Sequence, residues 1–392
     1  MSVLLKERQI KVLLVDDQAI VAAAVQRMLA PEQDILFLYC QDPTKALQTA
    51  IEFEPTVILQ DLIMPDIDGL TLVKFFRVHP QLKEVPLIVL SSKEEATTKA
   101  ESFALGANDY LVKLPDRIEL VARIRYHSAG YINLLQRNEA HAALLASQQA
   151  LAAELASAAE YVVSLLPEPI NSGPVSAEWR FFPSAELGGD CLGYHWIDAD
   201  HFAIYLLDVC GHGVGTALLS VSAFNALRSQ TLPGTDFLSP QQVLTALNDA
   251  FPMEKQNNLY FTIWYGVYNC RSRRLRYASG GHPPALLFTG DKEPVSLMTQ
   301  NVFIGGFPGV AYHEAVIDDV SAPARLYIFS DGAYEVDRLD GAMWTLDELE
   351  AYLAKTPGTG GQEIESLYAF LQEMCGKPVL EDDFSMLKVT LL

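Results

Sequence analysis

Aspartates that follow short apolar runs are the residues of this 392-residue chain best suited to chemistry. In the first third, Asp16, Asp17 and Asp61 each come directly after such a run, and Ser91 and Lys113 follow two later runs. Three carboxylates at one edge repel each other unless a hard cation lies among them, and their oxygens suit Mg²⁺. A metal-activated carboxylate can accept a phosphoryl group, and Lys113 can offset the incoming charge as a point cation.

Residues 1–129 show alternating strand and helix patterns, and these patterns predict where the aspartates lie in the fold. This order predicts an α/β domain, a doubly wound sheet of five parallel strands, whose ligands lie beyond the carboxyl ends of the strands. The predicted strands are Val12–Val15, Ile35–Tyr39, Val57–Leu59, Leu87–Leu90 and Tyr110–Val112. The predicted helices are Ala19–Leu29, Pro43–Phe53, Leu70–Phe76 and Thr97–Leu105.

Four segments of this region resemble a two-component receiver domain. They are VDD (15–17), LQDLIMPDIDG (59–69), VLSS (89–92) and ANDYLVK (107–113). The resemblance implies that Asp61 accepts phosphate from a sensor histidine kinase and that Asp16 and Asp17 hold Mg²⁺ together with Asp61. It further implies that Ser91 bonds the phosphoryl oxygen and that Tyr110 is the aromatic switch. For any single aspartate the alternative is a helix cap or turn residue.

One position departs from the receiver pattern. The family usually has proline directly after the lysine, whereas Leu114 here separates Lys113 from Pro115, which leaves the geometry of this turn open. The segment LVKLPDRIELVARIRYHS (111–128) is similar to receivers of response regulators that end in a diguanylate cyclase. No cyclase sequence follows, so this likeness concerns the receiver and its helical exit.

A second set of acidic motifs lies in residues 167–392. Asp190 ends ELGGD, Asp208 begins DVCGHG, Asp331 belongs to SDG, and Asp382 and Asp383 begin DDFS. Each motif lies beside an apolar strand pattern and has no basic residue nearby in sequence, which implies one or two hard divalent ions. Two ions about 3.5–4 Å apart can bridge a water molecule and lower its pKa for attack on a phosphate ester.

Two other chemistries are possible in these motifs. His212 and His282 could ligate zinc, but both lie in glycine-rich turns without a partner at zinc spacing, so a structural role is favoured. Cys210 could act as a nucleophile, but nothing in the sequence marks a base for it.

The elements of this second region read as an α+β sandwich of strands with helices between them. The predicted strands are Phe202–Asp208, Tyr260–Tyr268, Leu275–Ala278, Ala285–Phe288, Arg325–Phe329 and a closing strand Phe384–Leu391. The predicted helices are Val214–Arg228 and Pro240–Ala250, the latter opened by Ser239 as cap and by proline at its first position.

Five segments of this region resemble, in order, the PPM family of metal-dependent Ser/Thr phosphatases, in the bacterial branch of SpoIIE and RsbU. They are LGGD (187–190), DVCGHGVGTALLS (208–220), YASGGHPPALL (277–287), IFSDGAYEV (328–336) and EDDFSML (381–387). The resemblance implies a β-sandwich flanked by helices and, as cofactors, two Mn²⁺ or Mg²⁺ ions.

The same resemblance assigns the metal ligands. It implies that Asp208 bridges both ions and that the Val209 carbonyl adds a ligand. Asp331 and Asp382 would complete one ion, and Asp190 would bind directly or through water. The GGD motif departs from the family, because Cys191-Leu-Gly-Tyr follows it where an aromatic residue and a second aspartate are usual.

Residues 130–166 read as a long helix between the two regions. Leu144, Gln148, Leu151, Leu155, Ala158, Val162 and Leu165 succeed each other at steps of four and three, and the phase runs back to Leu134 through Arg137 and His141. This seam predicts either a helix packed on its own chain or a parallel coiled coil of two protomers, and the coiled coil is favoured. The predicted domains are therefore 1–129, 130–166 and 167–392.

Composition limits the partners and the compartment. The net charge of −21 disfavours nucleic acid and anionic membranes as partners. Five scattered cysteines, an N-terminus without a signal-peptide pattern and the lack of a membrane-length apolar stretch lead us to expect a reducing cytoplasm.

Two functions are consistent with these observations. The first is a response regulator that controls a metal-dependent phosphoserine/phosphothreonine phosphatase, whose substrate by family likeness is a phosphorylated anti-sigma-factor antagonist of the STAS type. The second is an adaptor similar to RssB, which binds a sigma factor or an anti-sigma partner without catalysis. The chain retains all four aspartate motifs, and converging carboxylates need a metal to be tolerated, so the enzyme is favoured.

Overall fold

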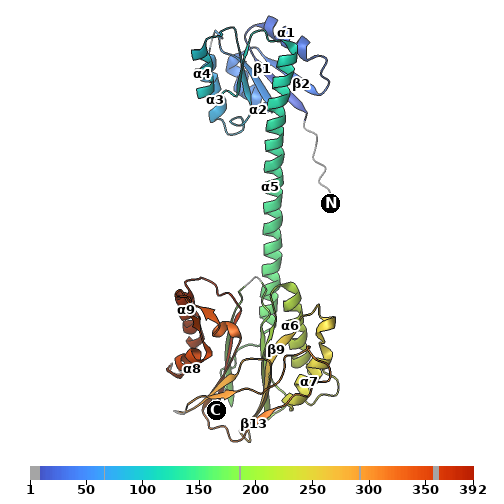
Figure 1. Ribbon diagram of the computed structural model, residues 1–392, viewed down its shortest axis with the longest axis vertical. Helices are drawn as coiled ribbons and strands as arrows, with labels where there is room; N and C mark the ends of the chain where they lie inside the picture. Colours follow the sequence, from blue (N-terminus) through green and yellow to red (C-terminus); the bar gives the residue numbers. More distant parts are fainter. Residues whose placement is uncertain (1–8, 66, 185–186, 291–292, 356–361) are drawn as a thin grey trace. The chain divides into compact units, whose positions relative to one another are not determined.

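The structure is a computed structural model that describes residues 9–65, 67–184, 187–290, 293–355 and 362–392. The chain divides into two compact units, Met1–Gln148 and Gln149–Leu392 (Figure 1). Among the described residues, no helix combines the length and the apolar character needed to cross a bilayer.

The first unit contains a parallel sheet of five strands in the order β2-β1-β3-β4-β5. Its strands are β1 (Ile10–Val15), β2 (Ile35–Cys40), β3 (Val57–Asp61), β4 (Leu87–Ser91) and β5 (Asp109–Val112). Its helices are α1 (Ala19–Leu29), α2 (Ala46–Phe53), α3 (Gly69–Val78), α4 (Ala96–Ala104) and the start of α5 (Arg117–Leu165). The predicted doubly wound sheet is confirmed.

Apolar residues on both faces of the strands explain why this sheet is covered on both sides. One core joins alternate strand residues such as Val12 and Leu14 to α1 and to the first turns of α5. The other core joins Leu13 and Val15 to α2 and α3. The predicted helix Pro43–Phe53 is a 3-10 turn, η1 (Pro43–Lys45), followed by α2, because Asp42 caps the turn and proline fixes its first residue.

Helix α5 is continuous for 49 residues, because no proline or glycine pair interrupts it. Its first turns bury Leu120, Ile124 and Ser128 against the sheet. Further along, the seam residues Leu144 and Leu151 are 56% and 58% exposed. The coiled coil and the boundaries after residues 129 and 166 stay predictions.

The second unit contains two antiparallel sheets of five strands each. The first has the order β13-β10-β9-β8-β7 and the second the order β12-β11-β14-β17-β6. The first sheet consists of β13 (Ala315–Ile317), β10 (Arg274–Gly280), β9 (Phe261–Asn269), β8 (His201–Val209) and β7 (Cys191–Trp196). The second consists of β12 (Val295–Leu297), β11 (Ala285–Thr289), β14 (Ala324–Phe329), β17 (Phe384–Leu391) and β6 (Val175–Phe182). A short hairpin pairs β15 (Val336–Asp337) with β16 (Met343–Trp344).

Helices cover both outer faces of this sandwich (Figure 1). The large core lies between the sheets and also includes α6 (Val214–Arg228) and α7 (Pro240–Ala250). A separate core packs α8 (Leu346–Lys355) and α9 (Glu363–Cys375) on the second sheet. The predicted α+β sandwich is confirmed, and the predicted α6, α7 and β17 have the observed bounds.

Candidate functional site

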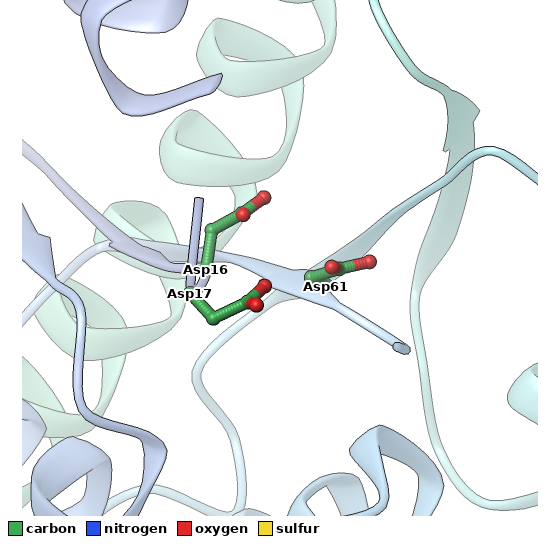
Figure 2. Close-up of side chains that lie close together, drawn as sticks. All are labelled: Asp16, Asp17 and Asp61. Atoms are coloured by element: carbon green, nitrogen blue, oxygen red, sulfur yellow. The ribbon is translucent and has the colours of Figure 1, made fainter. Parts of the chain in front are cut away.

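The three aspartates predicted for the first unit lie together at the carboxyl ends of β1 and β3 (Figure 2). One oxygen from each of Asp16, Asp17 and Asp61 lies within 4.8 Å of the others. Asp16 and Asp61 are buried, whereas Asp17 is half-buried. The pairing of β1 with β3 accounts for this convergence, because parallel neighbours end at the same edge.

Lys113 offsets part of this charge. Its Nζ lies 2.8 Å from Asp16 Oδ2 and 2.8 Å from Asp61 Oδ2. Burial raises the pKa of Asp16, and the Lys113 ammonium opposes this rise. Asp17 Oδ1 is buried and has no hydrogen-bond partner among the described residues. One ammonium for three carboxylates and an unpartnered oxygen is a set that fits a hard cation.

The predicted switch residues meet at one loop after β4. Ser91 is buried at the end of β4, and its Oγ accepts a hydrogen bond from the Lys93 backbone N–H at 3.3 Å. The Tyr110 hydroxyl donates to the Lys93 carbonyl at 2.6 Å. Both side chains therefore contact the same backbone segment. The turn that the sequence left open contains a cis peptide bond between Lys113 and Leu114.

Three of the aspartates predicted for the second unit surround a cavity of about 340 Å³. Asp208 lies near the end of β8, Asp331 begins the 3-10 turn η3 (Asp331–Ala333) after β14, and Asp382 precedes β17. The cavity is also lined by Ser184, Cys210, Gly211, His212, Tyr260, Thr262, Glu381 and Asp383. Asp190 is buried, and Asp208 contributes to raising its pKa, so these two carboxyls are neighbours.

Burial and mutual repulsion raise the pKa values of these carboxyls. The pKa of Asp208 rises to about 7, first through burial and then through the charges of Asp331 and Asp382. The pKa of Asp331 rises to about 6 through burial and the charges of Asp382 and Glu335, and that of Asp190 rises well above its ordinary value through burial and the Asp208 charge. No lysine or arginine is among the described residues that line the cavity.

Asp190 fits a cation by the lack of a positive partner. Both of its oxygens are buried without a hydrogen bond of good geometry in the described parts of the chain, and only the Ser330 and Ser385 hydroxyls lie near enough to lower its pKa. Buried oxygen donors without a resident counter-charge are the ligands that Mg²⁺ and Mn²⁺ take. The spacing is looser than in the first unit, because no three acidic oxygens of the described second unit lie within 4.8 Å of one another.

Asp383 holds the rim of the cavity together. Its Oδ1 accepts hydrogen bonds from Ser184 N at 2.8 Å and Ser184 Oγ at 3.0 Å, and its Oδ2 accepts one from Gly189 N at 2.7 Å. A Cβ at Gly189 would lie 2.5 Å from the Val209 carbonyl oxygen, so only glycine fits beside that carbonyl. The GGD loop is thereby fixed against Val209. Glu186, which opens the ELGGD motif, lies outside the described residues.

The residues considered for zinc binding or nucleophilic catalysis lie in two places: His212 and Cys210 line the cavity, and His282 is buried. His282 is buried, its Nδ1 lies 3.0 Å from the Pro283 carbonyl oxygen, and burial lowers its pKa to about 4, so the ring is neutral. His212 is exposed at the cavity. Cys210 also lines the cavity, where its Sγ accepts a hydrogen bond from the Tyr260 N–H.

Sequence reasoning missed several residues of the cavity, among them Tyr260, Thr262, Ser184 and Glu381. Thr262 lies on β9 directly opposite Asp208 on β8, and its Oγ1 is buried without a hydrogen-bond partner among the described residues. Tyr260 precedes the same strand. The cross-strand register that brings them to the cavity depends on pairing between segments about 50 residues apart, which no local pattern reports.

Comparisons with known proteins agree with this division of the chain. Residues 12–125 match the family model of the response regulator receiver domain. Residues 198–392 match the family model described as Stage II sporulation protein E (SpoIIE).

Two curated relatives come from Bacillus subtilis (strain 168). The phosphoserine phosphatase RsbP is 29% identical over 46% of this chain and 45% of its own length. The phosphoserine phosphatase RsbU is 25% identical over 63% of this chain and 72% of its own length. The chain thus spans about half the length of the first of these relatives.

A solved structure supports the fold of the second unit. The SiaA-PP2C domain of Pseudomonas aeruginosa matches 62% of this chain and 98% of its own length, with a TM-score of 0.53 and 19% identity. At this identity the likeness shows a shared fold.

Proposed function

Because the chain joins an N-terminal response regulator receiver domain to a C-terminal phosphatase domain of the SpoIIE/PPM type, we propose that it hydrolyses phosphoserine or phosphothreonine in a protein under control of the receiver. The cavity that combines Asp208, Asp331 and Asp382 beside buried Asp190, without a lining lysine or arginine among the described residues, carries this proposal. Such a site repels a phosphate ester unless cations occupy it, so it suits metal-dependent phosphate chemistry.

Asp208 would hold two ions, with the Val209 carbonyl, Asp331, Asp382 and Asp190 completing their ligands. Bound Mg²⁺ or Mn²⁺ would supply an activated water and neutralise charge on the phosphoryl group. The chain's own part is to hold the carboxylates at fixed strand ends. Asp383 supports them by anchoring the loop before Asp190.

In the receiver, Asp61 is the proposed phosphoacceptor, with Asp16 and Asp17 as Mg²⁺ ligands. Lys113 already lies 2.8 Å from an Asp61 oxygen, so its ammonium is in place to neutralise an incoming phosphoryl group. Ser91 and Tyr110 would report phosphorylation to the loop at Lys93, which both contact. A sensor histidine kinase is the proposed phosphodonor.

Within the second unit, contacts at the end of α5 suggest how a signal reaches the cavity. Arg228, the last residue of α6, donates from Nη1 to the Leu165 carbonyl at the end of α5, at 3.1 Å. The first residue of α6, Val214, directly follows the loop from Asp208 to Gly213. A shift of α5 would therefore pull on the helix that begins at the cavity. This route supports control of the cavity through α5.

The remaining partners follow from the same proposal. The seam residues Leu144 and Leu151 are more than half exposed, which supports a homodimer formed by a parallel coiled coil. The proposed substrate is a phosphorylated STAS-type antagonist of an anti-sigma factor, and the proposed compartment is the cytoplasm.

Hydrolysis of para-nitrophenyl phosphate by the full chain tests the proposal. We expect turnover only with Mn²⁺ or Mg²⁺ and a change of rate after treatment with acetyl phosphate. In Asp61→Asn, metal-dependent turnover should persist while the response to acetyl phosphate disappears. Absence of turnover in every state, together with absence of Mn²⁺ binding in calorimetry, would instead support the adaptor function.

A further inference from the structure

Three aromatic rings form a row that starts at the cavity and ends at the surface. Tyr260 lines the cavity, its ring centroid lies 4.3 Å from that of Phe303, and the Phe303 centroid lies 5.8 Å from that of Phe307. Phe307 is 51% exposed. These three residues are called the aromatic row below. Neither family motif nor metal site accounts for an exposed phenylalanine at this place.

Buried polar groups hold the outer end of the row. Asn248 Nδ2 donates to the Phe307 carbonyl at 2.9 Å, and Asn248 Oδ1 accepts from Gly305 N at 2.9 Å. The Tyr312 hydroxyl donates to the Phe303 carbonyl at 3.1 Å. Both Asn248 and Tyr312 are buried. The backbone that carries the two phenylalanines is therefore fixed by hydrogen bonds to the core, although Phe307 itself points partly into water.

Close packing also holds the middle ring. A Cβ at Gly281 would lie 3.0 Å from Phe303 Cβ, and a Cβ at Gly306 would overlap the Phe303 ring, so both glycines leave room for this side chain. A rigid aromatic surface loses little conformational entropy when it binds a partner. Aromatic side chains, phenylalanine among them, are enriched in the cores of protein interfaces.

We propose that the aromatic row binds an apolar side chain of the phosphoprotein substrate, two or three residues away from the phosphorylated serine. The proposal rests on the phosphatase function and adds to it a determinant of substrate choice. The row shares Tyr260 with the cavity, so a substrate chain whose phosphate lies among the aspartates can extend over the row. Its two steps of 4.3 and 5.8 Å correspond to about three residues of extended chain.

The negative charge around the cavity favours substrate recognition through an apolar contact over recognition through acidic side chains of the substrate. Glu381 and Asp382 are exposed at the rim, and neither lysine nor arginine is among the described residues that line the cavity. The phosphate would be recognised through the metal ions, whereas acidic residues flanking it would be repelled. Burial of a leucine on Phe307 and Phe303 supplies binding energy that does not depend on charge.

Phosphoserine peptides with the full chain and Mn²⁺ test the proposal. The probes are alanine-rich peptides with a single leucine at each position from three residues before to three residues after the phosphoserine, and one peptide without leucine. We expect kcat/KM to be about tenfold higher for a leucine two or three residues away than for the peptide without leucine. Phe307→Ala should remove this preference and leave the rate on para-nitrophenyl phosphate unchanged.

Two further variants serve as controls. Val295→Ala, at a side chain that is 47% exposed on β12, should keep the leucine preference. Phe307→Leu should retain most of it, because an apolar side chain remains in place. Equal rates for all peptides in the wild type, or an equal loss on peptide and aryl phosphate in Phe307→Ala, would overturn the inference alone. Absence of aryl phosphate turnover in the wild type would overturn the phosphatase function and the inference with it.

Discussion

The two aspartate clusters of this chain differ in how the repulsion among their carboxylates is compensated. In the receiver, Lys113 Nζ lies 2.8 Å from two of the three carboxylates, so part of the charge is offset by a resident ammonium. In the phosphatase domain, the described cavity lining contains no lysine or arginine, and the carboxyls lie farther apart. The receiver cluster therefore has an internal cation, whereas the phosphatase cluster must take up protons or metal ions.

This difference shows in the pKa values. Asp208, with its pKa raised to about 7, is partly protonated near neutral pH when metal is absent, and Asp331, with its pKa raised to about 6, takes up a proton at a somewhat lower pH. In Asp16, the Lys113 ammonium opposes the effect of burial. This contrast agrees with the proposed functions: a site that hydrolyses a phosphate ester would need open positions for ions, while a site that accepts a phosphoryl group would benefit from a cation already in place.

Replacement of the central carboxylate of the phosphatase cluster is expected to have the largest effect. Asp208→Asn removes the proposed ligand shared by both ions, so kcat/KM on para-nitrophenyl phosphate should fall at least about 10³-fold, the equivalent of about 4 kcal/mol. The far-UV circular dichroism spectrum should stay unchanged, since the carboxylate does not contribute to the core.

Asp249→Asn, at an exposed position of α7, is the matched control and should retain wild-type activity. If Asp208→Asn lost its fold instead of its activity, Asp208 would be a structural residue and the comparison of the two clusters would fail.

The second prediction concerns pH. The pKa of Asp208 is about 7 in the folded protein and about 3.9 in an unfolded chain, so the folded state binds more protons between these values. Stability without metal is therefore highest below about pH 4 with respect to this group and falls as the pH rises to 7, by up to about 1.4 kcal/mol per pH unit.

Tryptophan fluorescence isolates this transition, because all four tryptophans lie in the second unit. Thermal unfolding with EDTA should occur at a lower temperature at pH 7.5 than at pH 5.5, and saturating Mn²⁺ should raise the midpoint more at pH 7.5. Asp208→Asn should flatten the dependence. A midpoint that rises with pH in the metal-free wild type would contradict the charge repulsion inferred here.

The third prediction concerns Lys113, the cation of the receiver cluster. Lys113→Met leaves Asp16 and Asp61 buried without their ion pair, so we expect the receiver to lose about 3 kcal/mol of unfolding free energy in EDTA. Mg²⁺ should restore more stability to this variant than to the wild type, because it replaces the lost charge.

Urea unfolding followed by far-UV circular dichroism measures this, since the receiver has no tryptophan. Lys45→Met is the control: its ion pair with Asp42 is largely exposed and should contribute less than about 1 kcal/mol. Equal losses in both variants would mean that Lys113 does not compensate the cluster.

The elements with strong local signals could be predicted from the sequence. Helices α1, α6 and α7 have the predicted bounds, because their apolar periodicity or their N-terminal Ser-Pro signal is clear. The elements that the sequence analysis did not predict include the edge strands β6 and β7 as well as the short strands β12, β13, β15 and β16 and the helices α8 and α9. Strands β6 and β7 both lie at sheet edges, and β6 is mostly half-buried while β7 contains Gly193, so neither has the continuous apolar run of a central strand.

The residues of the candidate site also include some that the sequence could locate and others that it could not. Aspartates at strand ends could be located, because the end of a strand can be read from its own sequence. Tyr260 and Thr262 could not, since only the pairing of β8 with β9 brings Thr262 opposite Asp208. The resemblance assigned Asp382 as a metal ligand, but the sequence did not indicate that its neighbour Asp383 anchors the loop at Ser184 and Gly189, because this role depends on tertiary contacts.

These two neighbours provide the final prediction. Asp382 is exposed at the cavity, so Asp382→Asn should lower kcat/KM at limiting Mn²⁺ by about tenfold with no loss of stability. Asp383 is buried and accepts a backbone N–H at each of its two oxygens, whereas an asparagine amide has one oxygen and would place its NH₂ group against the other N–H. Asp383→Asn should therefore cost about 2 kcal/mol, read as a lower midpoint of the tryptophan-detected transition. If the two phenotypes were exchanged, Asp383 would be the ligand and Asp382 the support, and the rim of the phosphatase cluster would have to be assigned the other way round.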